Sequence, residues 1–231
     1  MLARLTIRRL TLSLVSLVPF AICTASGQTP AQPKVAPGPG EPDWKVLLEE
    51  RYGLSMFGDL KNPVETTAAK AIGRFRRSGP GEVTFTPLIA LGLPSRSRCG
   101  WYRTGPDGLP VKRPLWTYTF KNTAEDLKAD RNLPPPLEAG SVTRFDPGDG
   151  PFGLWASNDR FDDGGVFTEP AVVAAVNARL RKQPYKAMIY PVRDRTTGKD
   201  VPGSYLIGWE YSDNDDFQDI VCRIDNVILV K

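Results

Sequence analysis

The sequence predicts an all-β fold, an antiparallel β-sandwich of jelly-roll type with one or two short helices. Short runs rich in aromatic and β-branched residues recur along the chain, and 21 glycines and 22 prolines are spread between them as turn residues. The last two runs enclose an acidic segment, which is the pattern of a β-hairpin. We expect one domain over residues 43–231, because roughly 200 residues suit a single large β domain.

Residues 1–27 have the three parts of a secretory signal. Three arginines precede an apolar run at residues 10–25, and small residues follow it. The run is too short for a membrane span and is interrupted by Pro19, so we expect cleavage after Gly27 and no transmembrane segment in the mature chain. An uncleaved N-terminal anchor is the alternative. The sequence therefore predicts a secreted, periplasmic or cell-surface protein.

Residues 28–42 are expected to form a disordered linker rich in proline and glycine. The signal takes three of the 30 basic residues and none of the 26 acidic ones, so the mature chain carries 27 basic and 26 acidic residues. A balance so close to neutral predicts no nucleic-acid partner.

The charges are unevenly distributed along the chain. Residues 65–113 hold nine Lys/Arg and three Asp/Glu, whereas residues 145–231 hold ten and fourteen. This pattern fits two faces of one domain that complement each other, or a basic edge that meets an acidic partner. We expect the basic run at residues 70–77 to form a helical turn or an exposed arm.

Two short helices are expected. Asp43 is placed to cap the first, residues 44–52, and Gly53 to end it. The second has Thr168 as its cap and Pro170 in its first turn. Its buried stripe would consist of Val172, Val173, Val176 and Leu180. Strands are expected at residues 83–91, 100–103, 115–121, 141–145, 152–156, 186–192, 205–211 and 220–230.

The chain contains no histidine. This excludes Ser-His-Asp and Cys-His nucleophile systems and the HExxH zinc helix. Because nucleotide-binding glycine motifs and CxxC are also missing from the sequence, the chemistry left for an enzyme is a carboxylate pair, as in glycoside hydrolysis, with Glu210 as one member.

Cys99 and Cys222 are the two cysteines that remain after signal cleavage. In an exported protein they could form a disulfide, which would stabilise the fold by about 4 to 5 kcal/mol through loop closure. Two separately buried thiols are the alternative. Neither cysteine is expected to be catalytic, because the chain offers no histidine partner.

Acidic residues crowd the tip of the predicted C-terminal hairpin. They are Glu210, Asp213, Asp215, Asp216 and Asp219. A second acidic segment, residues 158–165, contributes Asp159, Asp162 and Asp163. If the two loops converge, their oxygens suit Ca²⁺, so a calcium site is one hypothesis and plain turn chemistry is the other.

Exposed tryptophans could bind carbohydrate by stacking on sugar rings. Trp101 and Trp155 lie beside glycines and loops, so they are the candidates for exposure, whereas Trp209 is assigned to the core. For each candidate, core packing is the alternative.

The C-terminal region resembles a domain of unknown function found near the C-terminus of exported bacterial proteins, and the chain as a whole is similar in style to exported planctomycete proteins. The family hallmark is a strand ending in Phe/Trp-Glu-Asp, a Gly/Asp-rich tip, and Asp-Phe/Tyr-Asn-Asp before the last strand. Trp209-Glu210 and residues 216–219 (DFQD) match it, and the resemblance covers about the last 90 residues. It implies an extracellular β-sandwich that binds calcium or adheres. Two positions depart from the family, Tyr211 in place of an aspartate and Lys186 in place of a frequent histidine.

These observations leave several classes of function. The first is an exported, non-catalytic binding or surface-associated module, with Ca²⁺ as its candidate stabilising ion and a carbohydrate or another cell-surface component as its candidate partner. The alternative is a carbohydrate-active enzyme, a glycoside hydrolase or lyase that uses Glu210 with an aspartate. An enzyme requires two carboxyls facing each other across a cleft, about 5 Å or 6.5 to 9.5 Å apart. A purely structural envelope component would have neither a cleft nor a cation site.

Overall fold

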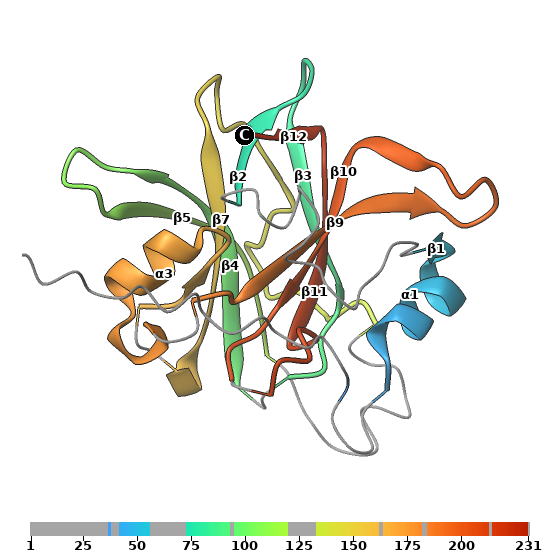
Figure 1. The fold of residues 1–231 in the computed structure, drawn as a ribbon, viewed down its shortest axis with the longest axis horizontal. Coiled ribbons are helices and arrows are strands. Elements are labelled where there is room, and N and C mark those ends of the chain that lie inside the picture. Colours follow the sequence, from blue (N-terminus) through green and yellow to red (C-terminus); the bar gives the residue numbers. More distant parts are fainter. Residues whose placement is uncertain are drawn as a thin grey trace, which may run out of the picture.

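A computed structural model of the chain has two antiparallel β-sheets packed face to face, with short helices on opposite sides (Figure 1). It describes residues 37, 42–55, 73–92, 95–119, 133–161, 164–181, 184–212 and 214–230. The predicted all-β sandwich with short helices is confirmed. The predicted signal and nearly all of the predicted linker lie outside the described residues.

The first sheet contains the C-terminal hairpin at its centre. Its order is β1 (Leu54–Ser55), β9 (Ala187–Asp194), β10 (Asp200–Trp209), β11 (Ile220–Asp225), β3 (Val83–Ile89) and β6 (Arg144–Phe145). The second sheet has β7 as its central strand. Its order is β12 (Val227–Leu229), β2 (Arg74–Arg77), β7 (Phe152–Asn158), β4 (Arg96–Thr104) and β5 (Pro110–Thr119), and β8 (Val166–Phe167) also pairs with β7.

The sandwich is closed on two sides by chain segments that cross between the sheets. On one side, Asn226 adopts a φ of 65° and bends the chain from β11 in the first sheet into β12 in the second. On the other side, residues 137–145 first run along β5, where Val142 N donates to Leu115 O at 2.8 Å, and then reach β3, where Thr143 O accepts from Phe85 N at 2.7 Å. These crossings cover strand edges that would otherwise expose backbone groups.

Alternation along the strands fills two apolar cores. Residues such as Ile207, Trp209 and Ile220 enter the core between the sheets, together with Phe85 and Trp116. The residues between them face the other side of the first sheet. There Met188, Tyr190, Val192, Leu206, Phe217 and Val221 pack with Trp44 and Leu48. The first sheet is therefore buried on both faces.

Helix α1 (Trp44–Tyr52) covers the outer face of the first sheet and matches its prediction. The Asp43 side chain accepts a hydrogen bond from Lys45 N at 2.9 Å, and Gly53 ends the helix with a φ of 62°, a conformation that glycine adopts at little cost. Only one face is buried, through Trp44 and Leu48.

The second predicted helix is shorter than expected. Helix α3 (Pro170–Val176) ends at Asn177, and a 3₁₀ turn, η2 (Ala178–Leu180), follows it. The predicted cap at Thr168 is wrong, because Glu169 holds the cap position and the Thr168 hydroxyl instead accepts from Leu154 N at 3.0 Å. Of the predicted stripe, Val173 and Leu180 are buried, whereas Val172 and Val176 are partly buried. Among the described residues, no helix is long and apolar enough to cross a membrane.

The basic run is part of the second sheet. Residues 74–77 form strand β2, so the predicted helical turn or exposed arm is wrong for them, and residues 70–72 lie outside the described part. Phe75 is fully buried while its arginine neighbours reach outward.

Arginines of the basic region, residues 65–113, pair with carboxylates later in the chain, and three of the four use carboxylates of the acidic region, residues 145–231. The pairs are Arg74 with Glu169, Arg77 with Asp146 and Asp149, Arg96 with Glu138, and Arg98 with Asp159. Four of the eight described basic residues of this region, residues 65–113, are therefore paired within the domain. The exposed pairs contribute little stability each, typically about 0 to 1 kcal/mol.

Cys99 and Cys222 face the same core from different sheets. Both are buried and free, so the structure has two separate thiols and not a Cys99–Cys222 disulfide. Burial raises the pKa of both thiols well above the usual value, and at Cys99 the neighbouring Cys222 adds to the rise.

We predict that both cysteines react with an alkylating reagent only after denaturation. The native protein should take up no label, because both sulfurs are in the inter-sheet core, and the denatured protein should take up two without a reducing agent. Mass spectrometry of the alkylated protein measures both numbers. Two labels that appear only after reduction would show that the exported protein carries the disulfide.

Candidate functional site

The acidic tip lies at the end of the hairpin that the sequence predicted. Strands β10 and β11 pair antiparallel from Ser204 opposite Asp225 to Trp209 opposite Ile220, so residues 210–219 connect them. The predicted hairpin is confirmed. Its tip lies near the end of α1, where Trp44 Nε1 donates to Asp216 O at 3.1 Å.

Three charged side chains come from neighbouring strand ends. Trp209 pairs with Ala187 on one side and Ile220 on the other, so Glu210 follows between Lys186 and Asp219. Glu210 N donates to Lys186 O at 3.1 Å, and Lys186 Nζ donates to Ser212 O at 2.5 Å. Lys186 and Glu210 are fully buried, and Asp219 is nearly so.

The Glu210 carboxylate is bound by the backbone of its own tip. Asp216 N and Phe217 N donate to Oε2 at 3.1 and 3.4 Å, and Ser212 Oγ donates to Oε1 at 2.6 Å. Asp215 and Phe217 have φ values of 61° and 56°, whereas Asp216 between them has a negative φ. Backbone segments that alternate in this way form nests, whose N–H groups bind anions. Glu210 therefore occupies the position that an external anion would take.

The other carboxylates of the tip also hold its backbone. Asp216 accepts from Gln218 N at 3.1 Å and from Asn214 Nδ2 at 2.5 Å, and Asp219 Oδ2 accepts from Tyr211 N at 2.5 Å. Bonds from carboxylates to nearby backbone N–H groups are turn chemistry.

Phe217 fixes the tip to the outer face of the first sheet. Its ring is fully buried beside Trp44, and its carbonyl lies so close to β10 that a Cβ at Gly208 would be 2.5 Å from it. Only glycine fits this approach, and burial of the ring offsets the cost of its positive φ.

Burial changes the protonation of the tip. It raises the pKa of Glu210 from 4.5 to about 7, with the charge of Asp219 as the second cause, while Ser212 and Lys186 oppose the rise. Burial also raises the pKa of Asp219 from 3.8 to about 7, and the charge of Asp216 adds to this despite the hydrogen bond from Tyr211 N. Both carboxyls are therefore harder to ionise in the folded protein.

The structure places the tip and the second acidic segment side by side, because Arg179 donates to Tyr211 O at 3.2 Å and lies over the Phe161 ring, but their described carboxylates do not converge on one point. Asp213, Asp162 and Asp163 lie outside the described residues, and Asp159 forms an exposed ion pair with Arg98. In the described part of the chain, no three acidic, histidine or cysteine residues form a group that could hold a metal ion. The calcium site stays a hypothesis, and the internal bonds of Glu210, Asp216 and Asp219 favour turn chemistry.

Of the two tryptophans that were expected to be exposed, Trp155 is buried and Trp101 is partly buried. Trp155, expected to be exposed, is 5% exposed, donates its indole N–H to Trp101 O at 3.1 Å, and lies under the Lys112 ammonium. The partly buried Trp101 stacks on Phe145 with ring centroids 5.5 Å apart. Trp209 is fully buried, as expected.

Sequence reasoning missed a buried cluster beneath α3. Glu169, 3% exposed, accepts from Tyr102 Oη at 2.7 Å and from Arg74 Nε at 2.8 Å. These residues are far apart in the sequence and carry no common motif, so no sequence signal joins them. The cluster attaches the start of α3 to the second sheet.

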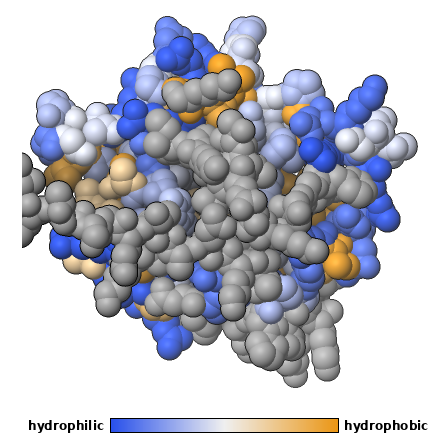
Figure 2. All heavy atoms as spheres, in the orientation of Figure 1, coloured by the Kyte–Doolittle hydropathy of each residue, from blue (hydrophilic) through white to orange (hydrophobic). Residues whose placement is uncertain are grey.

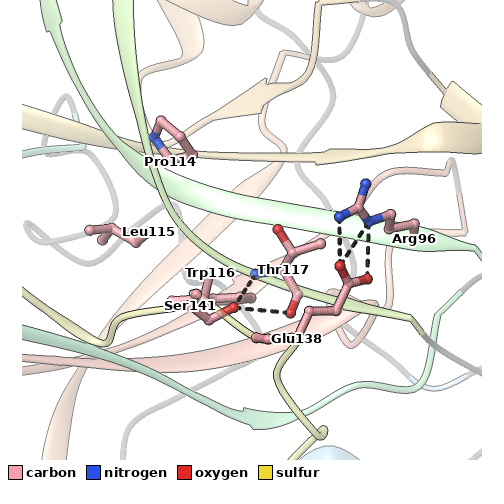
Figure 3. Close-up of a pocket in the computed structure, with 9 residues that line it drawn as sticks. Arg96, Pro114, Leu115, Trp116, Thr117, Glu138 and Ser141 are labelled. Carbon is pink, nitrogen blue, oxygen red and sulfur yellow. Dashed lines mark hydrogen bonds and ion pairs between the residues drawn. The ribbon is translucent and has the colours of Figure 1, made fainter.

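A shallow pocket of about 180 Å³ lies between β5 and the crossing segment 137–145 (Figure 3). Arg96 and Glu138 are joined across it by two-pronged hydrogen bonds, and Ser141 Oγ accepts from Thr117 N at 3.1 Å. The polar groups at this pocket therefore bond to one another.

Comparison of the chain with family models, curated proteins and solved structures finds no match in any of the three. The resemblance of the C-terminal region to a domain of exported bacterial proteins therefore stays a prediction.

We predict that stability falls as pH rises from 5 to 8. The folded pKa values of Glu210 and Asp219, both about 7, lie above the ordinary values of 4.5 and 3.8 expected in the unfolded chain. The folded state therefore binds more protons than the unfolded state over that range. For each extra bound proton, the free energy of unfolding falls by about 1.4 kcal/mol when the pH rises by one unit. Urea unfolding at several pH values measures this. Glu210→Gln should reduce the slope, because its amide oxygen still accepts from the backbone but does not titrate.

Glu210→Ala is the matched variant that removes the acceptor. It leaves Asp216 N and Phe217 N buried without this partner, and we expect a loss of about 2 to 5 kcal/mol at pH 5, where Glu210→Gln should be nearly neutral. Equal losses in the two variants would contradict the anchoring role of the carboxylate.

We predict that the melting temperature is the same in millimolar Ca²⁺ as in a chelator. The reason is that three of the four described carboxylates of the tip, Glu210, Asp216 and Asp219, already accept bonds from its backbone. A site with Kd near 10⁻⁴ M would instead stabilise the protein by about 2.7 kcal/mol at about 100 times Kd, a shift of several degrees. A melting scan in millimolar Ca²⁺ and in EDTA decides between them, and a shift that Asp216→Asn abolishes would restore the calcium hypothesis.

Proposed function

We propose that this chain is an exported, non-catalytic β-sandwich module that acts by binding to or associating with a cell surface. The observation that carries the proposal is the position of Glu210. An enzyme of the glycoside hydrolase class needs this carboxylate at a substrate, whereas here it is fully buried and bonded to Asp216 N and Phe217 N. The most distinctive acidic residue thus acts as a structural anchor.

Two further features support a module. Two other carboxylates of the tip, Asp216 and Asp219, are also nearly buried and also accept from backbone N–H groups, whereas Asp215 is partly buried. Loops on a rigid scaffold are the usual place for binding residues, and this sandwich is rigid because the first sheet is buried on both faces. The predicted signal at residues 1–27 supports export.

The test of export uses the full chain expressed in a Gram-negative host. The processed protein should lack residues 1–27 by intact mass and should fractionate outside the cytoplasm, partly with the cell envelope. Recovery of the unprocessed chain in the cytoplasm alone would overturn the proposal.

The test of catalysis uses the same purified protein on a panel of polysaccharides. We predict that the release of reducing ends and of unsaturated products stays at the level of the blank. The matched variants are Glu210→Gln and Glu138→Gln, which replace a buried and a more exposed carboxylate by its amide. Product release that Glu210→Gln abolishes and Glu138→Gln preserves would establish the enzyme instead.

A further inference from the structure

Two β-hairpins project from opposite sides of the sandwich and differ in chemistry. One connects β4 and β5 and the other connects β9 and β10 (Figure 1). Because both are extended antiparallel hairpins on the same scaffold, their side chains can be compared directly.

The β4–β5 hairpin exposes aliphatic side chains at its tip. Leu109 is 50% exposed and Val111 is 51% exposed. Most of the coloured surface in Figure 2 is hydrophilic, with hydrophobic residues in separate patches. The large hydrophobic side chains nearly half or more exposed in the described part of the chain are Val46, Leu109, Val111, Val142 and Ile228. The tip thus holds two of them within three residues.

Basic side chains flank these aliphatic ones. Val111 is opposite Arg103 and Arg113 is opposite Trp101, so alternation places Arg103, Val111 and Arg113 on one side of the hairpin. Lys112 points to the other side, where its ammonium lies over the Trp155 ring.

Two basic side chains of this hairpin bond to carbonyls and not to carboxylates. Arg103 donates to Pro147 O, and Lys112 Nζ donates to Gly164 O at 3.3 Å. Residues 103–113 contain three basic residues and one acidic residue, Asp107, whose carboxylate accepts from Leu109 N at 3.0 Å. Among the residues that the structure describes, Arg103, Lys112 and Arg113 form no ion pair. They differ in this from Arg74, Arg77, Arg96 and Arg98 of the same sheet, all of which do.

The β9–β10 hairpin has the opposite character. Its turn, residues 194–200, contains threonine, glycine and charged residues and no aliphatic side chain. Arg193 pairs with Asp200 at 2.7 Å, and the Asp194 carboxylate accepts from Thr197 N at 2.7 Å. This hairpin is a solvated extension, so projection alone does not explain the composition of the other one.

We propose that the tip of the β4–β5 hairpin docks on an anionic lipid surface. Leu109 and Val111 enter the headgroup layer, and the exposed Arg113 beside them contacts the lipid phosphates. Arg103 and Lys112, which bond to carbonyls of the sandwich, add long-range attraction. Exposed aliphatic residues combined with basic ones suit the membrane interface, where burial of apolar area and attraction to anionic lipids add up. The inference rests on the proposed function and names the surface with which the module associates.

The shape of the tip favours a lipid surface over an acidic peptide. An acidic peptide that buries apolar side chains needs a groove for them, whereas Leu109 and Val111 are half exposed on a hairpin that projects from the sandwich (Figure 1). The pocket at β5 does not serve the tip, since it begins at Pro114 and is lined by the already bonded Arg96 and Glu138. A fluid surface needs no groove, because it deforms around the inserted side chains.

The test is sedimentation of the exported protein with vesicles of phosphatidylcholine alone and of phosphatidylcholine mixed with phosphatidylglycerol. We expect binding to the mixed vesicles, weakening as salt is raised, and little binding to the neutral ones. The double variant Leu109→Ser/Val111→Thr should lower the partition coefficient roughly tenfold. All variants are compared in the same processed form, so that the N-terminal region contributes equally.

Arg113→Gln and Lys199→Gln are the matched pair for charge. Each removes one cation from a projecting hairpin, and neither side chain is in a core, so both variants should fold as judged by an unchanged melting temperature. Arg113→Gln should weaken binding about fivefold and Lys199→Gln should leave it unchanged. Equal losses in the two variants, no loss in the apolar double variant, or no binding to the mixed vesicles would each overturn the lipid inference.

Cell fractionation separates this inference from the function on which it rests. If the vesicles fail but the exported protein still fractionates with the envelope, the lipid contact is wrong and the proposed function stands. If the protein is not exported at all, both fail.

Discussion

The burial of the Glu210 carboxylate is the constraint on which the C-terminal half depends. A carboxylate removed from water has a high free-energy cost unless donors surround it, and here Asp216 N, Phe217 N and the Ser212 hydroxyl supply them. To present two consecutive N–H groups, the backbone takes up the positive φ values at Asp215 and Phe217. That geometry in turn directs the Phe217 ring into the outer core and the Asp216 carbonyl toward the Trp44 indole. One buried carboxyl group thus specifies the tip, and the tip contacts α1 through the Trp44 indole.

Closure of the sandwich depends on two segments that belong to both sheets. The bend at Asn226 carries the last strand from one sheet to the other, and the segment before β6 bonds first to β5 and then to β3. Both crossings satisfy backbone groups that strand edges would leave open. The β4–β5 and β9–β10 hairpins project beyond this closed body. Because the core does not use the side chains at their tips, those residues can vary in composition.

Much of the fold could be predicted because its signals are local. Helix α1 has a capping aspartate, a buried stripe and a terminal glycine, and the C-terminal hairpin has two β-rich runs around a polar turn. Strand β2 was missed because its four residues hold one apolar side chain, Phe75, between arginines. Alternation still applies to it, since Phe75 enters the core and Arg74 and Arg76 do not.

The site was harder to predict from the sequence. The sequence shows how many carboxylates lie close together along the chain, but it does not show which donors or side chains surround each of them. Trp155, for example, has glycines around it in the sequence, yet its partner in β8, Phe167, and the Lys112 ammonium cover it.

The same contacts between distant residues explain why the acidic tip and the basic hairpin have different roles in one molecule. A charged group that the fold surrounds with donors is already bound, so it has little left to offer a partner, and its removal is felt as instability. A charged group that projects with no carboxylate beside it keeps its long-range attraction, weakened only by salt. Glu210 belongs to the first kind and Arg113 to the second. For this sandwich the density of charge along the sequence is therefore a poor guide to binding, and the exposure and pairing of each charge are better ones.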